Sequence, residues 1–136
     1  MKFGRGNARI EVNIPTRATL FRAVSARFTA RDGFALATLN LDHLAKLPRD
    51  PAFATAYKAQ DLVVADGRPV VWLSRLAGRP VALMPGSDLI EPLCRLAAEK
   101  GVPVAFVGST DEALAGAARA LQARVPGLEI SYRHAP

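Results

Sequence analysis

The chain has 136 residues, half of them hydrophobic, and a formal net charge of +6 at pH 7. This length suits one domain with a substantial core, so we expect a single domain over residues 1–136. The apolar runs are strand-sized, and no signal-peptide core follows the N-terminus, which argues against membrane spans and secretion. The single cysteine excludes an internal disulfide and a thiolate-rich metal site, so the cytoplasm is the expected compartment.

The positive charge comes mostly from arginines that are spread along the chain and not gathered in a run. Such a chain favours anionic partners, for example phosphates or an anionic membrane surface. Aromatic residues are few and do not alternate with basic ones. A base-stacking surface is therefore not indicated, and we expect no nucleic acid partner.

The first part of the chain predicts a strand, a helix and a second strand. Polar and apolar residues alternate over 8–14, as in a half-buried strand. Apolar residues recur at helical spacing over 17–31, and Thr16 stands where a capping residue is expected. The run 34–39 is short and mostly apolar, which is typical of a strand covered on both faces.

The middle of the chain predicts short helices around another apolar strand. Asn40 precedes a short helix that ends at Pro48, and Asp50 opens a further helix. Residues 61–66 form a short apolar strand that ends on a carboxylate. A tight turn follows at Gly67.

Beyond that turn, a helix is expected over 69–76, and we place Trp72 in the core. The segment 79–85 is irregular or a minor strand. A well-marked helix then runs over 87–100, with Asp88 at the start of a capping-box spacing.

The last part of the chain predicts a strand over 102–107, a helix to about residue 124 and a final strand over 128–132. The continuous apolar run of the first of these strands indicates a central parallel strand, and Ser109 begins another capping-box spacing. Strands that alternate with helices predict an α/β fold, with a mostly parallel sheet and helices on both faces.

Polar turns follow three of the predicted strands, and a fourth polar turn opens a helix. Because carboxyl ends of parallel strands lie along one sheet edge, we expect these turns to form one crevice. The turns contain Thr38 and Asn40, Asp66 and Gly67, Gly108 and Ser109, and the helix-opening Gly86-Ser87-Asp88.

Each of these residues has a chemical interpretation and an ordinary one. Asp66 is placed to act as a general base towards a hydroxyl group. Gly108 allows a ligand to approach the backbone, and N–H groups at a helix start can bind a phosphate. The ordinary interpretation is that Asp66, Asn40 and Ser109 only cap helices and that the glycines only form turns.

Other residues carry weaker signals. The sequence has neither G-x-G-x-x-G nor G-x-x-x-x-G-K-[ST], which disfavours a dinucleotide-dependent dehydrogenase and a P-loop nucleotidase. His43 and His134 are far apart and give no metal signature. We interpret His43 as a surface or capping residue and Cys94 as a small core residue.

The ordered set of turns resembles the WecG/TagA/CpsF glycosyltransferases, that is, glycosyltransferase family 26. The resemblance extends from about residue 8 to 132. It is carried by Thr38-Leu39-Asn40, Asp50-Pro51-Ala52-Phe53, Asp61-Leu62-Val63-Val64-Ala65-Asp66-Gly67, Gly86-Ser87-Asp88-Leu89 and Phe106-Val107-Gly108.

This resemblance implies a Rossmann-like α/β fold and an inverting glycosyltransferase without a metal cofactor. The donor would be a UDP-sugar, and the sugar would be of the N-acetylmannosamine type or a related hexose. The acceptor would be a polyprenyl-diphosphate-linked glycan of cell-surface polysaccharide or exopolysaccharide biosynthesis. The enzyme would be cytoplasmic, peripheral on the inner face of the cell membrane, and a homo-oligomer is a further hypothesis.

The resemblance also implies roles for individual residues. Asp66 takes the position of the catalytic base, and Thr38 lines the same pocket. The substrate-binding residues would be Asn40, Gly67, Gly86, Ser87, Asp88, Gly108 and Ser109.

The chain departs from the family pattern in two ways. Residues 82–85 include no basic residue, although family members often carry one shortly before the Gly-x-Asp turn. The chain also ends before the family's C-terminal part, so we expect a truncated form, a fragment or a diverged short member.

Two hypotheses from other classes stay open. One is a catalytically inactive module that binds a nucleotide-sugar. The other is a phosphoacceptor receiver domain with Asp66 as the acceptor, which is disfavoured because Asn13-Ile14-Pro15 offers no acidic pair for magnesium.

Overall fold

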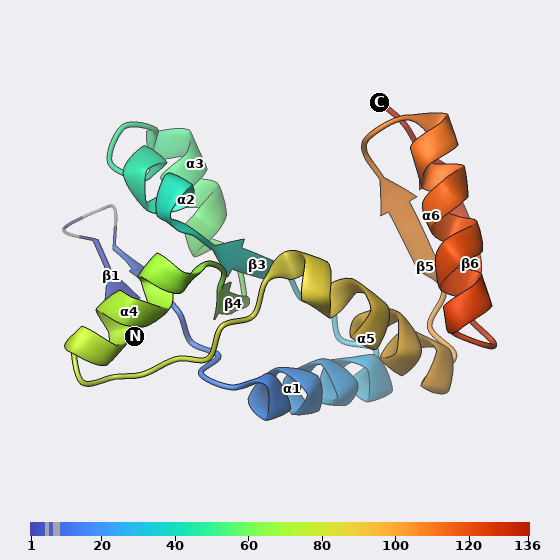
Figure 1. Cartoon of the computed structure of the whole chain (residues 1–136), viewed down its shortest axis with the longest axis horizontal. Coiled ribbons are helices and arrows are strands. Elements are labelled where there is room, and N and C mark those ends of the chain that lie inside the picture. The colour runs from blue at the N-terminus through green and yellow to red at the C-terminus, as the bar shows by residue number, and fades with distance from the viewer. Residues whose placement is uncertain (5, 7–8) are drawn as a thin grey trace.

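The computed structural model describes residues 1–4, 6 and 9–136, so the first residue of the strand expected over 8–14 lies outside the described residues. Strands and helices alternate along the chain, which confirms the predicted α/β class (Figure 1). The elements are β1 (Lys2–Phe3), β2 (Ile10–Glu11), α1 (Arg17–Ala30), β3 (Leu36–Leu39), α2 (Leu41–Lys46), α3 (Pro51–Lys58), β4 (Leu62–Ala65), α4 (Arg68–Leu76), α5 (Gly86–Glu99), β5 (Val104–Val107), α6 (Asp111–Arg124) and β6 (Ile130–His134).

Strands β3 and β4 form a parallel pair in the centre of a Rossmann-like α/β arrangement. Their register sets Thr38 opposite Val64 and Leu39 opposite Ala65. Leu83 adds an isolated parallel bridge to Ala65, so the segment predicted as irregular or a minor strand extends this sheet by one bridge. Every residue of β4 is buried, as the apolar run predicted.

The expected strand over 8–14 is reduced to β2, which pairs with β1 in an antiparallel ribbon. The side chain of Asn13 explains part of this difference. Its Nδ2 donates to the carbonyl of Asp61 at 2.7 Å, and its Oδ1 accepts from the N–H of Val63 at 2.8 Å. A side-chain amide therefore pairs with the β4 segment here, beside a backbone bond from the N–H of Ile14 to the carbonyl of Val63 at 3.3 Å.

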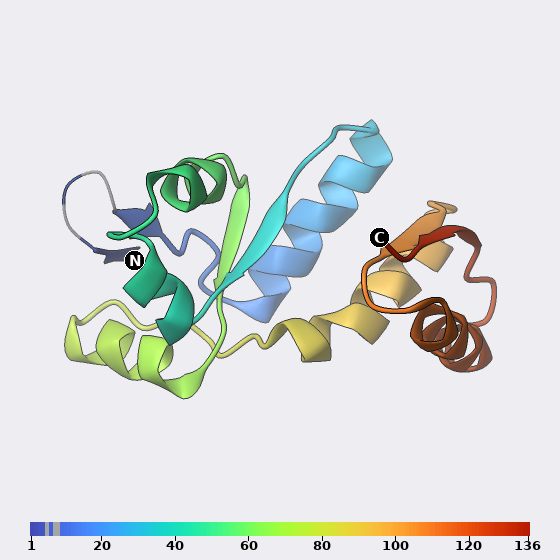
Figure 2. The same cartoon turned by 90° about the horizontal axis from the view of Figure 1, so that it is seen from above.

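In the part of the chain that the structure describes, the strands lie in three two-stranded sheets, so the prediction of β5 as a central strand is wrong. β5 pairs with β6, and its Val107 is 70% exposed. The β5–β6 pair stands apart from β3–β4 in both views, with α5 leading from one to the other (Figures 1 and 2). A continuous apolar run does not distinguish a central strand from a strand with one open face.

Helix α5 joins the two parts because it has two apolar faces. Leu89 and Leu93 pack in the cluster formed with α1 and β4, which includes Leu20 and Val64. Cys94 packs on the other side, in the cluster formed with α6 and β6, and is buried as predicted.

Helix α4 confirms the predicted range but not the predicted face. Val70, Val71 and Ser74 are buried, whereas Trp72 is 63% exposed, so its assignment to the core is wrong. At 3.6 residues per turn the three buried residues share one side, and Trp72 lies on nearly the opposite side. Ser74 is satisfied in the core because its hydroxyl donates to the Val71 carbonyl at 2.7 Å.

Helix capping follows the local sequence for three helices. Thr16, Asn40 and Asp50 each accept a hydrogen bond from the backbone N–H three residues later, as predicted. The two predicted capping boxes are wrong. α5 has Pro85 at its N-cap, and α6 is capped by Thr110.

Candidate functional site

The candidate site lies where β3 and β4 end. Thr38 is the third residue of β3, and Asp66 follows the last residue of β4. The N–H of Asp66 donates to the carbonyl of Leu39 at 2.8 Å, which continues the pairing of the two strands by one residue. The parallel register thus brings both polar side chains to one edge of the sheet, where ligands bind in open α/β folds.

The N-terminus of α5 reaches the same place. The N–H of Gly86 donates to Oδ2 of Asp66 at 3.4 Å. A Cβ atom at Gly86 would lie 3.4 Å from Cγ2 of Thr38 and 4.0 Å from both Oγ1 of Thr38 and Oδ2 of Asp66. Glycine therefore keeps the space between the hydroxyl and the carboxylate free.

Asp66 does not cap α4, the helix that follows it, contrary to its ordinary interpretation. The N-cap of α4 is Gly67, which has φ 101° and offers no side-chain hydrogen bond. A positive φ of this size favours glycine and turns the chain sharply after β4. The Asp66 carboxylate instead lies beside the start of α5, where its Oδ2 accepts from the N–H of Gly86.

Tyr57 and His43 contact the carbonyl of Thr38, and the sequence analysis did not place either of them in the site. The hydroxyl of Tyr57 donates to the Thr38 carbonyl, and Nδ1 of His43 lies 3.1 Å from the same oxygen and 3.2 Å from the Tyr57 hydroxyl. The His43 ring packs against both Phe53 and Tyr57. His43 is half-buried, so its interpretation as a surface or capping residue is wrong.

The pKa of Tyr57 depends on its burial and on the charge of Asp66. Burial, followed by the negative charge of Asp66, raises the pKa of Tyr57 from 10.0 to about 12. The phenol therefore stays protonated at neutral pH and remains a donor to Thr38. Helical spacing in α3 gave one signal, because Phe53 and Tyr57 are four residues apart and share a face.

Arg17 is a second residue that the sequence interpretation missed. Its guanidinium donates to the carbonyl of Asp88 at 3.3 Å and lies over the ring of Phe21, 5.5 Å from the centroid. It brings a positive charge to the first turn of α5, near the segment 82–85 that has no basic residue. The available signal was its position, since a cation in the first turn of α1 opposes the helix dipole.

Three further predicted residues lie around this centre. Asn40 uses Oδ1 to cap α2, where it accepts from the N–H of His43 at 2.9 Å. The hydroxyl of Ser87 donates to Oδ1 of Asp88 at 3.2 Å, and both side chains are exposed.

The structure does not bring Gly108 and Ser109 to this centre. They follow β5, which belongs to the other parallel pair. Gly108 has φ 118°, and its N–H donates to the carbonyl of His134 at 2.9 Å. Ser109 has φ 60° and precedes the cap of α6. The expectation that all the polar turns form one crevice therefore holds only for the turns after β3 and β4 and the start of α5.

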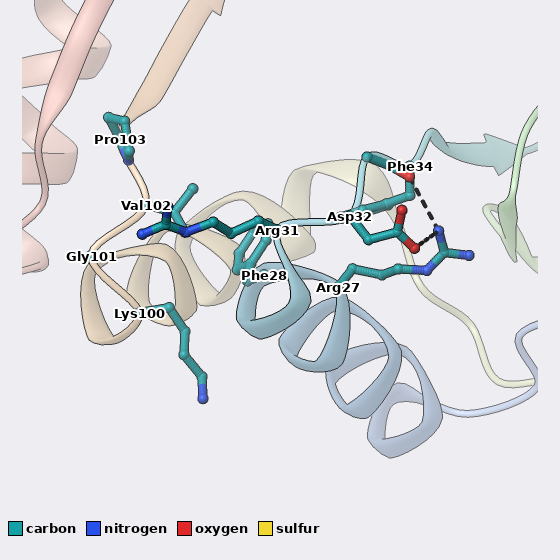
Figure 3. A pocket seen from close by; sticks show the side chains of 10 residues that line it. Arg27, Phe28, Arg31, Asp32, Phe34, Lys100, Gly101, Val102 and Pro103 are labelled. Carbon is teal, nitrogen blue, oxygen red and sulfur yellow. Dashed lines mark hydrogen bonds and ion pairs between the residues drawn. The ribbon is translucent and has the colours of Figure 1, made fainter.

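A cleft of about 570 Å³ opens elsewhere on the molecule (Figure 3). Its walls come from the end of α1, the approach to β3 and the turn between α5 and β5. Arg27 is ion-paired there with Asp32 at 2.9 Å. The cleft lies at the amino ends of β3 and β5, whereas Thr38 and Asp66 lie at the carboxyl ends of their strands.

Within the described parts of the chain, no cluster of three or more histidine, cysteine, aspartate or glutamate residues is placed to hold a metal ion. No helix in those parts combines the length and apolar character needed to cross a membrane.

The fold and the site together define a Rossmann-like α/β protein with a carboxylate, a hydroxyl and a helix N-terminus at one sheet edge. This is a site suited to proton abstraction beside an anionic group. The family model for glycosyl transferases of the WecG/TagA/CpsF family matches residues 7–136, so the chain belongs to that family, and glycosyl transfer is its class of activity. A comparison with curated proteins gives no significant match.

Proposed function

We propose that this protein transfers a sugar from a UDP-sugar to a hydroxyl group of a lipid-linked acceptor, with inversion at the anomeric carbon. The observation that carries the proposal is the convergence of Thr38, Asp66 and Gly86. The charges of the site fit sugar transfer from a nucleotide, because the Asp66 carboxylate lies next to the N-terminus of α5.

In the proposed reaction the Asp66 carboxylate takes the proton of the acceptor hydroxyl. The acceptor oxygen attacks the anomeric carbon, and the bond between that carbon and the diphosphate oxygen breaks. UDP leaves with the electron pair of this bond. The positive end of the α5 dipole, together with the guanidinium of Arg17, stabilises the charge on the departing diphosphate.

Thr38 is the proposed partner of Asp66, since its hydroxyl can bind the acceptor or a sugar hydroxyl in the space left by Gly86. Asn40, Gly67, Ser87 and Asp88 are proposed to surround the substrates. Gly108 and Ser109 stay predictions for the donor side.

Family membership supports the finer choices of substrate. We propose an N-acetylmannosamine-type or related hexose as the sugar and a polyprenyl-diphosphate-linked glycan as the acceptor. The reaction would serve cell-surface polysaccharide biosynthesis at the inner face of the membrane. A single domain over residues 1–136 is part of the same proposal.

The test compares Asp66→Asn with the unchanged chain in transfer of labelled sugar from a UDP-sugar to a polyprenyl-diphosphate acceptor. We expect at least about a hundredfold loss of turnover, with UDP binding retained in calorimetry. Asp111→Asn is the matched control, because this exposed carboxylate lies in α6, away from the site. Unchanged turnover in a folded Asp66→Asn protein would remove Asp66 as the base.

Gly86→Ala gives a second, steric test. The added methyl group meets Thr38 at ordinary van der Waals distance, so we expect a normal fold. It occupies the space between the hydroxyl and the carboxylate, so we expect transfer to fall about tenfold or more. Full activity of this variant would place the substrates elsewhere.

The alternative function is a module that binds a nucleotide-sugar without transferring it. The separation of Gly108 and Ser109 from Asp66 favours this alternative, because the contacts that these two residues are predicted to make with the donor would lie away from the base. UDP binding in calorimetry without sugar transfer would support this alternative over the enzyme.

A further inference from the structure

The solvent face of α4 is unusually apolar. Trp72 is 63% exposed, Leu73 44% and Leu76 87%, while the opposite side of the helix is buried in the core. At 100° per residue, Trp72 and Leu76 lie next to each other at the centre of this face. Clustered exposed apolar side chains of this kind mark an interaction surface.

Positive charge borders the same face. Arg68 and Arg75 lie beside Trp72 on the helical wheel, and Arg79 follows at the end of the helix; all three are exposed. The stretch from Gly67 to Ser87 contains no acidic residue. In the parts of the chain that the structure describes, no salt bridge joins any of these three arginines to a carboxylate.

We propose that this α4 face, formed by Trp72, Leu73, Leu76 and the three arginines, docks on an anionic lipid bilayer. Tryptophan and leucine enter the headgroup region, where an amphipathic ring is favoured, and arginines reach the lipid phosphates while their stems cover apolar surface. The proposal does not depend on the role of Asp66 in catalysis.

The charges favour a membrane over a second copy of the chain. A symmetric contact between two α4 faces would bring arginines of like charge together without acidic partners. A helix of nine residues is also only about 14 Å long, which is small for an interface of roughly 800 Å² per partner. A lipid surface removes both difficulties, since it is anionic and extends beyond the helix.

Helix α4 begins next to the candidate site. The helix begins directly after Asp66-Gly67, and it lies at the end of the molecule away from β5–β6 (Figures 1 and 2). A bilayer held by α4 would therefore lie close to the candidate site, within one short helix length.

Trp72 is the only tryptophan, so the unchanged protein carries its own probe. We expect its fluorescence to shift to the blue, and acrylamide quenching to weaken, when phosphatidylglycerol-containing vesicles are added. Pure phosphatidylcholine vesicles should cause a much smaller change. Absence of a shift with the anionic vesicles would overturn the proposal.

Variants separate this surface from the overall charge. Arg68→Gln/Arg75→Gln/Arg79→Gln should weaken vesicle co-sedimentation about a hundredfold, at about fivefold per arginine. Arg22→Gln/Arg119→Gln/Arg133→Gln lowers the net charge equally but lies outside α4, and it should bind nearly as well as the unchanged chain. Equal loss in the two triple variants would show attraction by net charge alone and overturn the assignment to α4.

The apolar part has its own matched pair. Leu76→Ser should reduce vesicle binding about tenfold, whereas Val107→Ser, at the exposed end of β5, should leave it unchanged. If Trp72 instead becomes shielded as protein concentration rises without vesicles, the face binds a second copy and the lipid proposal is wrong.

Discussion

Replacing Tyr57 by phenylalanine tests the support beneath Thr38. The change removes one hydroxyl and keeps the ring that packs on Phe53 and His43. The Thr38 carbonyl loses one donor but keeps Nδ1 of His43 at 3.1 Å. Because that oxygen is not left without a partner, we expect a loss of about 1 kcal/mol in the free energy of unfolding at pH 8. For a chain of this size this corresponds to about 4 °C in Tm.

The pH dependence gives a sharper expectation. The pKa of Tyr57 is raised from 10.0 to about 12 in the folded chain, so the folded state holds this proton more tightly than the unfolded state. The resulting stability is fully present below pH 10 and is lost as the pH rises from about 10 to 12. Two pKa units correspond to at most about 3 kcal/mol.

The assay is urea unfolding followed by circular dichroism between pH 8 and 12. Alkaline pH changes the stability of the chain in other ways as well, so the informative quantity is the difference between the unchanged chain and Tyr57→Phe. The other tyrosine is the control, because Tyr132 is 57% exposed and Tyr132→Phe should leave the alkaline loss intact. An identical alkaline loss in Tyr57→Phe would refute the reasoning.

Two other changes test packing and capping. Ser74→Ala should cost about 1–3 kcal/mol in unfolding free energy, because the buried N–H of Val81 loses its acceptor at 3.1 Å. Urea titration measures this loss, and Ser87→Ala, at an exposed position, is the comparison. An equal small loss in both variants would contradict the expectation. Thr110→Ala should cost about 1 kcal/mol by thermal unfolding, since its hydroxyl caps α6, whereas Ser109→Ala should cost little. The reverse order would restore Ser109 as the cap.

Local interactions made much of the fold predictable from the sequence. Helix caps at Thr16, Asn40 and Asp50 depend only on neighbouring backbone groups, so short-range chemistry identified them. The alternation of strands and helices likewise follows from residue spacing within each segment. The central carboxylate and hydroxyl were also identifiable, because Asp66 and Thr38 occur at strand ends.

Long-range packing decided the rest. Trp72 and Val107 have apolar side chains in apolar segments, and only the arrangement of neighbouring elements leaves them exposed. Tyr57 and Arg17 join the site through contacts with residues 19 and 71 positions away, which no local pattern encodes. His43 joins it through Thr38 and Tyr57. The sequence by itself thus determined the alternation of strands and helices and the caps at Thr16, Asn40 and Asp50, because these depend on a few neighbouring groups. Only the tertiary structure decided which strand ends meet, because α5 separates the β5–β6 pair from the β3–β4 pair.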